Sequence, residues 1–332
     1  MKTGSALGVG IVGLGEIGQF HLRGYAQARD CQIRAVADLD PGLVSAAADA
    51  YSARGYSSLD ELLADTSVEV VSVCLPHRLH HDVVLRSVAA GKHVLCEKPL
   101  CMTVEECDDV IEAAASAGVT VGVQHNQLFY PAHIRARELI GSGAIGRPVM
   151  ARLRLAIGGK FPGWRAQPSE TGGGILFDAG VHRFYVARFL LGEVAEVAAM
   201  ADRPPQEGED AAVVLMRFTS GALGVIEANY HAPSGSFDDS IEVCGSAGSL
   251  YISGCEAEFQ GFCTGPALAR YDGSWHYERA GQGDWADSVA ASIGAYVRAV
   301  SQGEAAPVPA TEGRRIIELI QQVYNVMEVG AA

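Results

Sequence analysis

The sequence predicts an α/β protein made of two successive domains. Over residues 1–125, short β-rich runs alternate with amphipathic helical stretches, which is typical of a doubly wound parallel sheet. From residue 126 to 332 the β-rich runs come in pairs separated by tight turns, which is typical of antiparallel hairpins. We therefore expect a doubly wound domain at 1–125, followed at 126–332 by an α+β domain with a mainly antiparallel open sheet.

Length, composition and charge agree with a globular chain. Charged residues make up 19% of the 332 positions and apolar residues 48%, a balance unlike that of disordered or fibrous proteins. A formal net charge of −14 without a basic stripe argues against nucleic acid as a partner. No apolar run reaches membrane-spanning length and the N-terminus does not read as a signal peptide, so we expect a cytoplasmic protein without a membrane partner.

The elements of the first domain follow the strand–helix alternation. Two helix starts are marked by capping boxes, Ser58 with Glu61 and Thr103 with Glu106. Strands are predicted near 8–12, 32–37, 69–74, 93–96 and 119–123.

The second domain begins with helices and continues into hairpins. Turns at Ser220–Gly221 and Ser246–Gly248 each join two alternating β-runs. The remaining elements are predicted as a helix at 131–142, a strand from 149, a helix at 175–191, loops at 201–209 and 264–285, and a final helix at 311–328.

The cysteines do not form a metal-binding or redox motif. None of the eight belongs to a C-x-x-C pair, and several lie in apolar strands, where cysteine acts as a small hydrophobic residue. We predict reduced thiols and no zinc site, because the ten histidines also lack an H-E-x-x-H pattern. The cysteines are at positions 31, 74, 96, 101, 107, 244, 255 and 263.

A glycine fingerprint follows the first predicted strand. Both "GVGIVG" (8–13) and "GLGEIG" (13–18) satisfy G-x-G-x-x-G, but only the second follows a strand and opens a helix, as a pyrophosphate-binding turn requires. Asp38 ends the second strand, where an acid accepts hydrogen bonds from a ribose 2′-hydroxyl and repels a 2′-phosphate. The pattern predicts a Rossmann domain that binds NAD in preference to NADP, although a glycine-rich turn without a ligand would look similar.

Lys98 lies just beyond the fourth predicted strand, at the sheet edge where ligands of such domains bind. Pro99 favours an extended Lys98 and permits a cis bond between them. The alternative is a surface lysine at a turn. In the second domain, Asp178 and His182 are four residues apart on an otherwise apolar helix, as in an acid–base pair whose carboxylate orients the imidazole. Here the alternative is a buried pair that only braces the fold.

Several strings together resemble the glucose–fructose oxidoreductase / inositol dehydrogenase / rhizopine-catabolism (Gfo/Idh/MocA) family. They are "GLGEIG", "AVADLD", "LPHRLHH", "AGKHVLCEKPL", "WRAQPSETGGGILFDAGVH" and "IEVCGSAGSLYI", which occur in this order over nearly the whole chain. The resemblance implies NAD(P)-linked oxidation of sugars or cyclitols, catalysed by Lys98, Asp178 and His182. It also implies a homodimer or homotetramer assembled through the C-terminal sheet.

The resemblance assigns further residues to the cofactor and substrate. Trp164 and Arg165 match a "WR" pair that reaches over the cofactor, unless they form an exposed loop with a packed tryptophan. Two departures from the family pattern are Leu75, in place of threonine, and "NQLFYP" at 126–131, which lacks an arginine. The predicted cofactor residues are Gly13, Gly15, Glu16, Ile17, Gly18, Asp38, Leu75, Pro76, His77, His80, Glu97, Lys98, Trp164 and Arg165. The predicted substrate residues are Lys98, Asn126, Lys160, Asp178 and His182.

These assignments lead to a hypothesis of an NAD-dependent dehydrogenase that oxidises a secondary alcohol of a polyol or glycoside to a ketone, or reduces the ketone. His182, oriented by Asp178, would take the hydroxyl proton and Lys98 would stabilise the alkoxide. The acidity of the chain also fits an amino sugar or aminoglycoside. Two rivals are a redox-neutral enzyme that uses NAD transiently to cleave glycosides, and a non-catalytic NAD-binding sensor.

Overall fold

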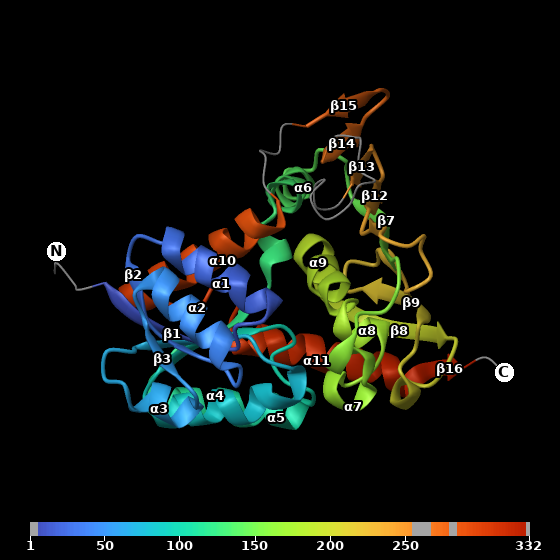
Figure 1. Cartoon of the computed structure of the whole chain (residues 1–332). Helices are drawn as coiled ribbons and strands as arrows, with labels where there is room; N and C mark the ends of the chain where they lie inside the picture. Colours follow the sequence, from blue (N-terminus) through green and yellow to red (C-terminus); the bar gives the residue numbers. More distant parts are fainter. Residues whose placement is uncertain (1–5, 254–266, 279–283, 330–332) are drawn as a thin grey trace. The chain divides into compact units, whose positions relative to one another are not determined.

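The computed structural model (Figure 1) describes residues 6–253, 267–278 and 284–329. The chain divides into two compact units. Unit 1 comprises Met1–Asn126 and Ala286–Ile317, and unit 2 comprises Gln127–Trp285 and Glu318–Ala332. The segment 286–317, which the sequence assigned to the second domain, therefore belongs to the first unit, while the first boundary lies within one residue of the prediction.

Unit 1 contains a six-stranded sheet in the order β3-β2-β1-β4-β5-β6, with every neighbouring pair parallel. Except for the short edge strand β3, which is largely exposed, the strands are mainly buried apolar runs, as expected for a parallel sheet covered on both faces. After β1 the chain adds β2 and β3 on one side of it, and then adds β4, β5 and β6 on the other side. The carboxyl ends of β1 and β4 therefore form the switch point where such folds bind ligands. The strands are β1 Leu7–Val12, β2 Cys31–Ala37, β3 Arg54–Tyr56, β4 Val70–Val73, β5 His93–Glu97 and β6 Val121–Gln124.

The helices of unit 1 follow the predicted capping signals. Ser58 caps α3 by accepting a hydrogen bond from the Glu61 amide, and Thr103 with Glu106 forms a complete capping box on α5. Helix α10, to which the sequence analysis assigned no element, packs its buried face in this unit, where Gly24 and Gly122 leave room for its side chains. The helices are α1 Glu16–Gln27, α2 Pro41–Tyr51, α3 Leu59–Ala64, α4 His80–Ala89, α5 Val104–Ala117, α10 Trp285–Gln302 and the first half of α11 Ala310–Val326.

Unit 2 contains a ten-stranded mixed sheet in the order β15-β14-β13-β12-β7-β10-β9-β8-β16, with β11 also paired to β7. Most pairs are antiparallel, as predicted, whereas β7 with β10 and β8 with β16 are parallel. Both predicted hairpins are present, as β9–β10 and β12–β13. The strands are β7 Pro148–Ile157, β8 Val194–Ala201, β9 Ala211–Phe218, β10 Leu223–Asn229, β11 Phe237–Asp238, β12 Ile241–Gly245, β13 Ser249–Ile252, β14 Leu268–Tyr271, β15 Trp275–Tyr277 and β16 Met327–Val329.

Two predictions for unit 2 were wrong. The segment 264–285 is not a loop throughout, because β14 and β15 lie within it. The predicted helix 175–191 is divided into α8 Ile175–Asp178 and α9 Val181–Leu191, since Ala179 and Gly180 interrupt the regular hydrogen bonding. The other helices are α6 Pro131–Gly141 and α7 Pro168–Thr171.

The two faces of the unit 2 sheet differ. Helices α6, α8 and α9 pack against one face, and strand β9 alternates accordingly, with Val214 and Met216 buried but Val213 and Leu215 exposed. We call the second face the open face. Large apolar side chains that reach solvent on it are Met150, Met200, Val213, Leu215, Leu223, Tyr251, Tyr271, Trp275 and Tyr277.

Two further predictions can be compared with the described residues. Six of the eight cysteines carry free thiols, as predicted, while Cys255 and Cys263 lie outside the described ranges. Within those ranges, the helices are too short or too polar to cross a bilayer.

Candidate active site

The glycine turn between β1 and α1 has the geometry that a dinucleotide requires. Gly13 has a φ of +87°, and a Cβ there would lie 2.1 Å from the Cys74 carbonyl oxygen, so this position requires glycine. A Cβ on Gly18 would meet the Gly13 carbonyl oxygen, also at 2.1 Å, which fixes how closely α1 packs on the turn. Gly15 is exposed, with open space beside it, and no side chain caps the helix there. The turn therefore presents the helix N-terminus to an anion, as the chemistry of a pyrophosphate demands.

Asp38 lies at the end of β2 and is held by main-chain groups. Its carboxylate accepts hydrogen bonds from the Leu14 amide at 2.6 Å and the Asp40 amide at 2.9 Å. These contacts tie the acid to the glycine turn, yet it remains partly exposed and each oxygen has a further lone pair. Beside it, Leu39 is 93% exposed.

The segment that carries Lys98 is held by hydrogen bonds of unit 1. The Lys98–Pro99 bond is cis. Both ring nitrogens of the fully buried His80 lie at main-chain oxygens, Nδ1 at 2.7 Å from that of Pro99 and Nε2 at 2.9 Å from that of Leu75. Burial lowers the pKa of His80. This histidine joins two segments that the sequence assigns to the cofactor edge, but its own ring is covered.

In unit 2, the Asp178 carboxylate accepts hydrogen bonds from two side chains. The Arg165 guanidinium donates to both of its oxygens, with Nε at 2.9 and 3.1 Å and Nη2 at 2.9 Å. The Tyr230 hydroxyl donates to Oδ2 at 3.0 Å. Burial and the neighbouring carboxylate raise the pKa of Tyr230, which keeps it a phenol that donates. Asp178 is 1% exposed, so these donors replace the water that its charge requires.

The aromatic ring of Phe161 completes this cluster. The Arg165 guanidinium lies 3.5 Å from the centroid of that ring, and the ring meets Tyr230 edge-on at 6.5 Å. Arginine stacked on an aromatic face and paired to a carboxylate has little freedom to rotate. Arg165, predicted to reach over the cofactor, is thus a partner of Asp178 in this structure, and Tyr230 is a residue that sequence reasoning missed.

His182 lies in the first turn of α9, four residues after Asp178, which ends α8. Its side chain is largely buried and its ring meets that of Trp285 edge-on, with centroids 5.9 Å apart. The sequence placed Asp178 and His182 on one continuous helix. In the structure, a break at Ala179–Gly180 separates the helices that carry them.

The glycine run before α8 serves the fold of unit 2. A Cβ on Gly174 would lie 2.1 Å from the Glu209 carbonyl oxygen, and one on Gly173 would lie 2.2 Å from the Tyr324 hydroxyl. Glu209, fully buried, accepts hydrogen bonds from the amides of Gly174 and Leu176 and from Tyr324. The close approach that these glycines allow is therefore to Glu209 and Tyr324.

The two predicted substrate residues outside the catalytic set are already bonded. Asn126 is buried in unit 1 and its amide donates to the Ser288 hydroxyl at 2.8 Å. Lys160 is exposed in unit 2 and forms an ion pair with Asp210. Trp164 lies half-buried in a 3₁₀ turn with Arg165.

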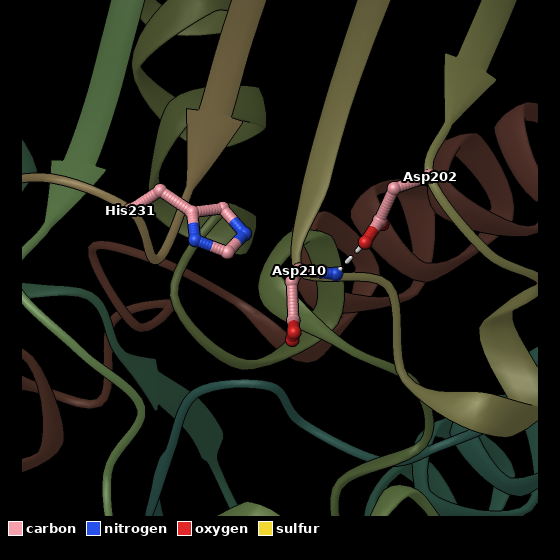
Figure 2. A group of neighbouring side chains, drawn as sticks. All are labelled: Asp202, Asp210 and His231. Atoms are coloured by element: carbon pink, nitrogen blue, oxygen red, sulfur yellow. Dashed lines mark hydrogen bonds between the residues drawn. The ribbon is translucent and has the colours of Figure 1, made fainter.

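Figure 2 shows a group of potential metal ligands, Asp202, Asp210 and His231, at the ends of β8, β9 and β10. One ligand atom of each lies within 4.8 Å of the others. Asp202 accepts the Asp210 amide at 2.9 Å, and the Asp210 carboxylate pairs with both Lys160 and Arg203. Because two cations already neutralise its buried member, the group fits an ion-pair cluster, and we assign no metal to it.

Two family models cover most of the chain. Residues 7–125 match the oxidoreductase family with an NAD-binding Rossmann fold, and residues 133–251 match the GFO/IDH/MocA C-terminal domain.

The chain belongs to the Gfo/Idh/MocA family of oxidoreductases.

Relatives within this NAD-binding family act on sugars and cyclitols according to their names. The myo-inositol 2-dehydrogenase of Thermotoga maritima is 32% identical over 73% of this chain and 74% of its own length. The 1,5-anhydro-D-fructose reductase of Ensifer adhaerens is 36% identical, but the match covers 59% of this chain and 60% of that protein.

Two solved structures share the fold over nearly the whole chain. An NAD-binding oxidoreductase from Klebsiella pneumoniae superposes with a TM-score of 0.85 at 27% identity, covering 97% of each chain. GenD2 from gentamicin A biosynthesis, solved in complex with NAD, has a TM-score of 0.83 at 25% identity, covering 98% of this chain and 95% of its own.

Proposed function

We propose that the chain is an NAD-dependent dehydrogenase that oxidises a secondary alcohol of a cyclitol or sugar, or catalyses the reverse reduction. The observation that carries the proposal is the buried Asp178 carboxylate with its two donors, Arg165 and Tyr230, four residues before His182. A buried carboxylate with two donors, four residues before a histidine, suits an acid–base site better than a binding surface. Family membership and the geometry of the glycine turn support NAD as the cofactor.

In this mechanism His182 takes the proton from the substrate hydroxyl. Asp178 stays ionised, because Arg165 and Tyr230 both favour its charged form, and it orients and charges the imidazole. The positive charge of Lys98 stabilises the negative charge that develops on the substrate oxygen as it becomes an alkoxide. Bound NAD⁺ supplies the hydride acceptor. In the reduction, the protonated His182 returns the proton to the alkoxide.

We further propose that NAD is preferred over NADP. The Asp38 carboxylate is fixed by two amides beside the glycine turn, and a fixed negative charge there accepts ribose hydroxyls and repels a 2′-phosphate.

A polyol is the favoured substrate, and an amino sugar is the second candidate. The second rests on the likeness to GenD2, whose name places it in gentamicin A biosynthesis. Inositols, levoglucosan, free sugars and aminoglycosides therefore form one assay panel.

The open face of the unit 2 sheet supports the proposal of a homo-oligomer. Apolar side chains gather there on neighbouring strands, among them Met200, Leu215 and Leu223, and a contiguous exposed apolar surface marks an interface. A second copy of the chain would cover it symmetrically.

The test is the appearance of reduced nicotinamide absorbance when the panel is incubated with NAD⁺ or NADP⁺. We expect turnover with a polyol and NAD⁺, and a loss of about 100-fold or more in kcat for Lys98→Ala and His182→Ala. His231→Ala, which removes an exposed imidazole of the same unit, serves as the control. Near wild-type turnover in both catalytic variants would refute the assignment, and glycoside cleavage without net reduction would favour a redox-neutral enzyme.

A further inference from the structure

A buried histidine of helix α1 has no part in the mechanism above. His21 is fully buried, and both of its ring nitrogens have side-chain partners in unit 1. Nδ1 lies 2.7 Å from the Ser72 hydroxyl, in β4, and Nε2 lies 3.0 Å from Glu97 Oε1, at the end of β5. One ring thus joins a helix to two neighbouring strands of the parallel sheet.

Packing alone would not require a histidine at this position. The other buried side chains of α1 include Leu22 and Tyr25, and an apolar residue would fill the same space without a polar group to satisfy. A buried imidazole without partners costs about 1–3 kcal/mol, whereas here both nitrogens are within hydrogen-bonding distance of a partner. The contacts are therefore the feature that distinguishes histidine from leucine at residue 21.

Glu97, the partner of His21, is bonded on its other side to the peptide that carries Lys98. Its Oε1 faces the imidazole, and its Oε2 accepts a hydrogen bond from the Lys98 amide at 3.1 Å. The carboxylate is 15% exposed, so it lies between the buried ring and the surface where Lys98 begins. A movement of the imidazole would shift the carboxylate, and with it the Lys98 main chain.

The charge of the ring suits this arrangement. Burial opposes a charged imidazole, but the neighbouring Cys74 sulfur and the Glu97 carboxylate outweigh it and raise the pKa of His21 to about 10. The protonated ring carries two N–H donors, one for Ser72 and one for Glu97. A charged donor to a carboxylate is the stronger kind of hydrogen bond and holds its acceptor more firmly.

We propose that His21 is a positioning residue that holds Glu97 and, through it, the Lys98 main chain in the place that the reaction requires. The proposal rests on the proposed role of Lys98 in catalysis. Because α1 also begins at the glycine turn, the same helix that would bind the pyrophosphate fixes the segment of the catalytic lysine.

Two matched substitutions separate positioning from packing. His21→Gln can place its amide nitrogen near the original Nε2 and keep the bond to Glu97, whereas the shorter His21→Asn reaches only the Nδ1 position beside Ser72. Both are polar and similar in size, so a purely structural role would make them equally harmful. Ser72→Ala is the companion variant, because it removes the other partner and leaves Glu97 bonded.

The readout uses the scarcity of lysine in this chain, which has only Lys2, Lys92, Lys98 and Lys160. Reductive methylation with ¹³C-formaldehyde labels these amines, and a Lys98→Arg sample identifies the Lys98 resonance. In His21→Asn we expect this resonance to move while those of Lys92 and Lys160 stay, and kcat with NAD⁺ to fall about 10- to 100-fold with KM little changed. His21→Gln and Ser72→Ala should keep the resonance in place and retain kcat within about threefold.

The outcomes are distinct from those that test the proposed function. If the wild-type chain reduces no NAD⁺ with any member of the panel, the dehydrogenase assignment fails, but the Lys98 resonance still decides the role of His21. The positioning role is overturned if His21→Asn leaves the Lys98 resonance unchanged, or if the glutamine and asparagine variants disturb it equally.

Discussion

Asp178 illustrates how much of a site depends on residues that sequence spacing does not reveal. Its position one turn before His182 was predicted, whereas Arg165 and Tyr230, thirteen residues before it and fifty-two after it, are brought to it by the fold. A buried carboxylate without donors would be protonated, because burial penalises the charge. These two side chains therefore decide whether Asp178 can orient a histidine.

Removing the hydroxyl of Tyr230 should weaken the stabilisation of the Asp178 carboxylate without abolishing it, because Arg165 still donates to it. In Tyr230→Phe the carboxylate keeps Arg165 but loses a hydrogen bond to a charged group, worth about 1.5–3 kcal/mol. We expect kcat to fall by about tenfold or more with KM little changed, measured by reduced nicotinamide absorbance. Tyr251→Phe on the open face is the control, and an unchanged kcat in Tyr230→Phe would show that Arg165 suffices.

The raised pKa of His21 predicts how stability depends on pH. Burial opposes protonation of the ring, but Cys74 and Glu97 raise the pKa of His21 in the folded protein from its ordinary value of 6.5 to about 10. The ring also lies against Tyr25. Its stabilising contribution is thus complete below about pH 6.5 and is lost as the pH rises through 10.

Thermal melts between pH 7 and 10 should reveal this loss. The Tm of the wild-type chain is expected to fall by about 2–4 °C for each kcal/mol lost, and that of His21→Gln, which cannot be protonated, should fall less. Parallel curves for the two proteins would contradict the charged state of His21.

At the scale of elements, the glycine run before α8 makes the clearest prediction. Gly174→Ala would place a Cβ 2.1 Å from a main-chain oxygen of Glu209, where no side-chain rotation can relieve the contact. We expect a loss of about 1–3 kcal/mol in the free energy of unfolding, measured with urea. Gly141→Ala, at the end of α6 with open space around it, should be neutral or slightly stabilising.

The elements themselves were largely predictable from local signals. Capping residues Ser58 and Thr103 marked helix starts because their side chains act within one turn, and both are confirmed. The division between α8 and α9 was not predictable, since an apolar run with one glycine reads as a continuous helix. Strand β15 is short and exposed along its length, so it lacks the alternation by which strands are recognised.

The residues of the candidate site could be predicted only in part from the sequence. Gly13 and Gly18 follow from a local turn, and the structure gives the close approaches that require them. The contact of Tyr230 with Asp178 depends on the register of the second sheet, which no local pattern specifies. The roles of Lys98 and His182 remain proposals that the variants above test.

At the scale of the whole molecule, the open face predicts the state of association. Leu215→Asp places a charge among exposed apolar side chains, and a charge desolvated in an interface without a partner is costly. We expect light scattering after size exclusion to give a smaller assembly for this variant than for the wild-type chain. Ile134→Asp, on helix α6, should leave the mass unchanged, and an unaltered mass in Leu215→Asp would place the interface elsewhere.

The pairing of Arg165 with Asp178 also bears on which substrates the proposed site can distinguish. Together the two side chains form a neutral dipole, whose field decays faster with distance than that of a lone carboxylate. The field of this pair would therefore add little binding energy for an ammonium group on a sugar. Selectivity among the candidates would then depend on the stereochemistry of the hydroxyl groups and on the shape of the ring, rather than on net charge.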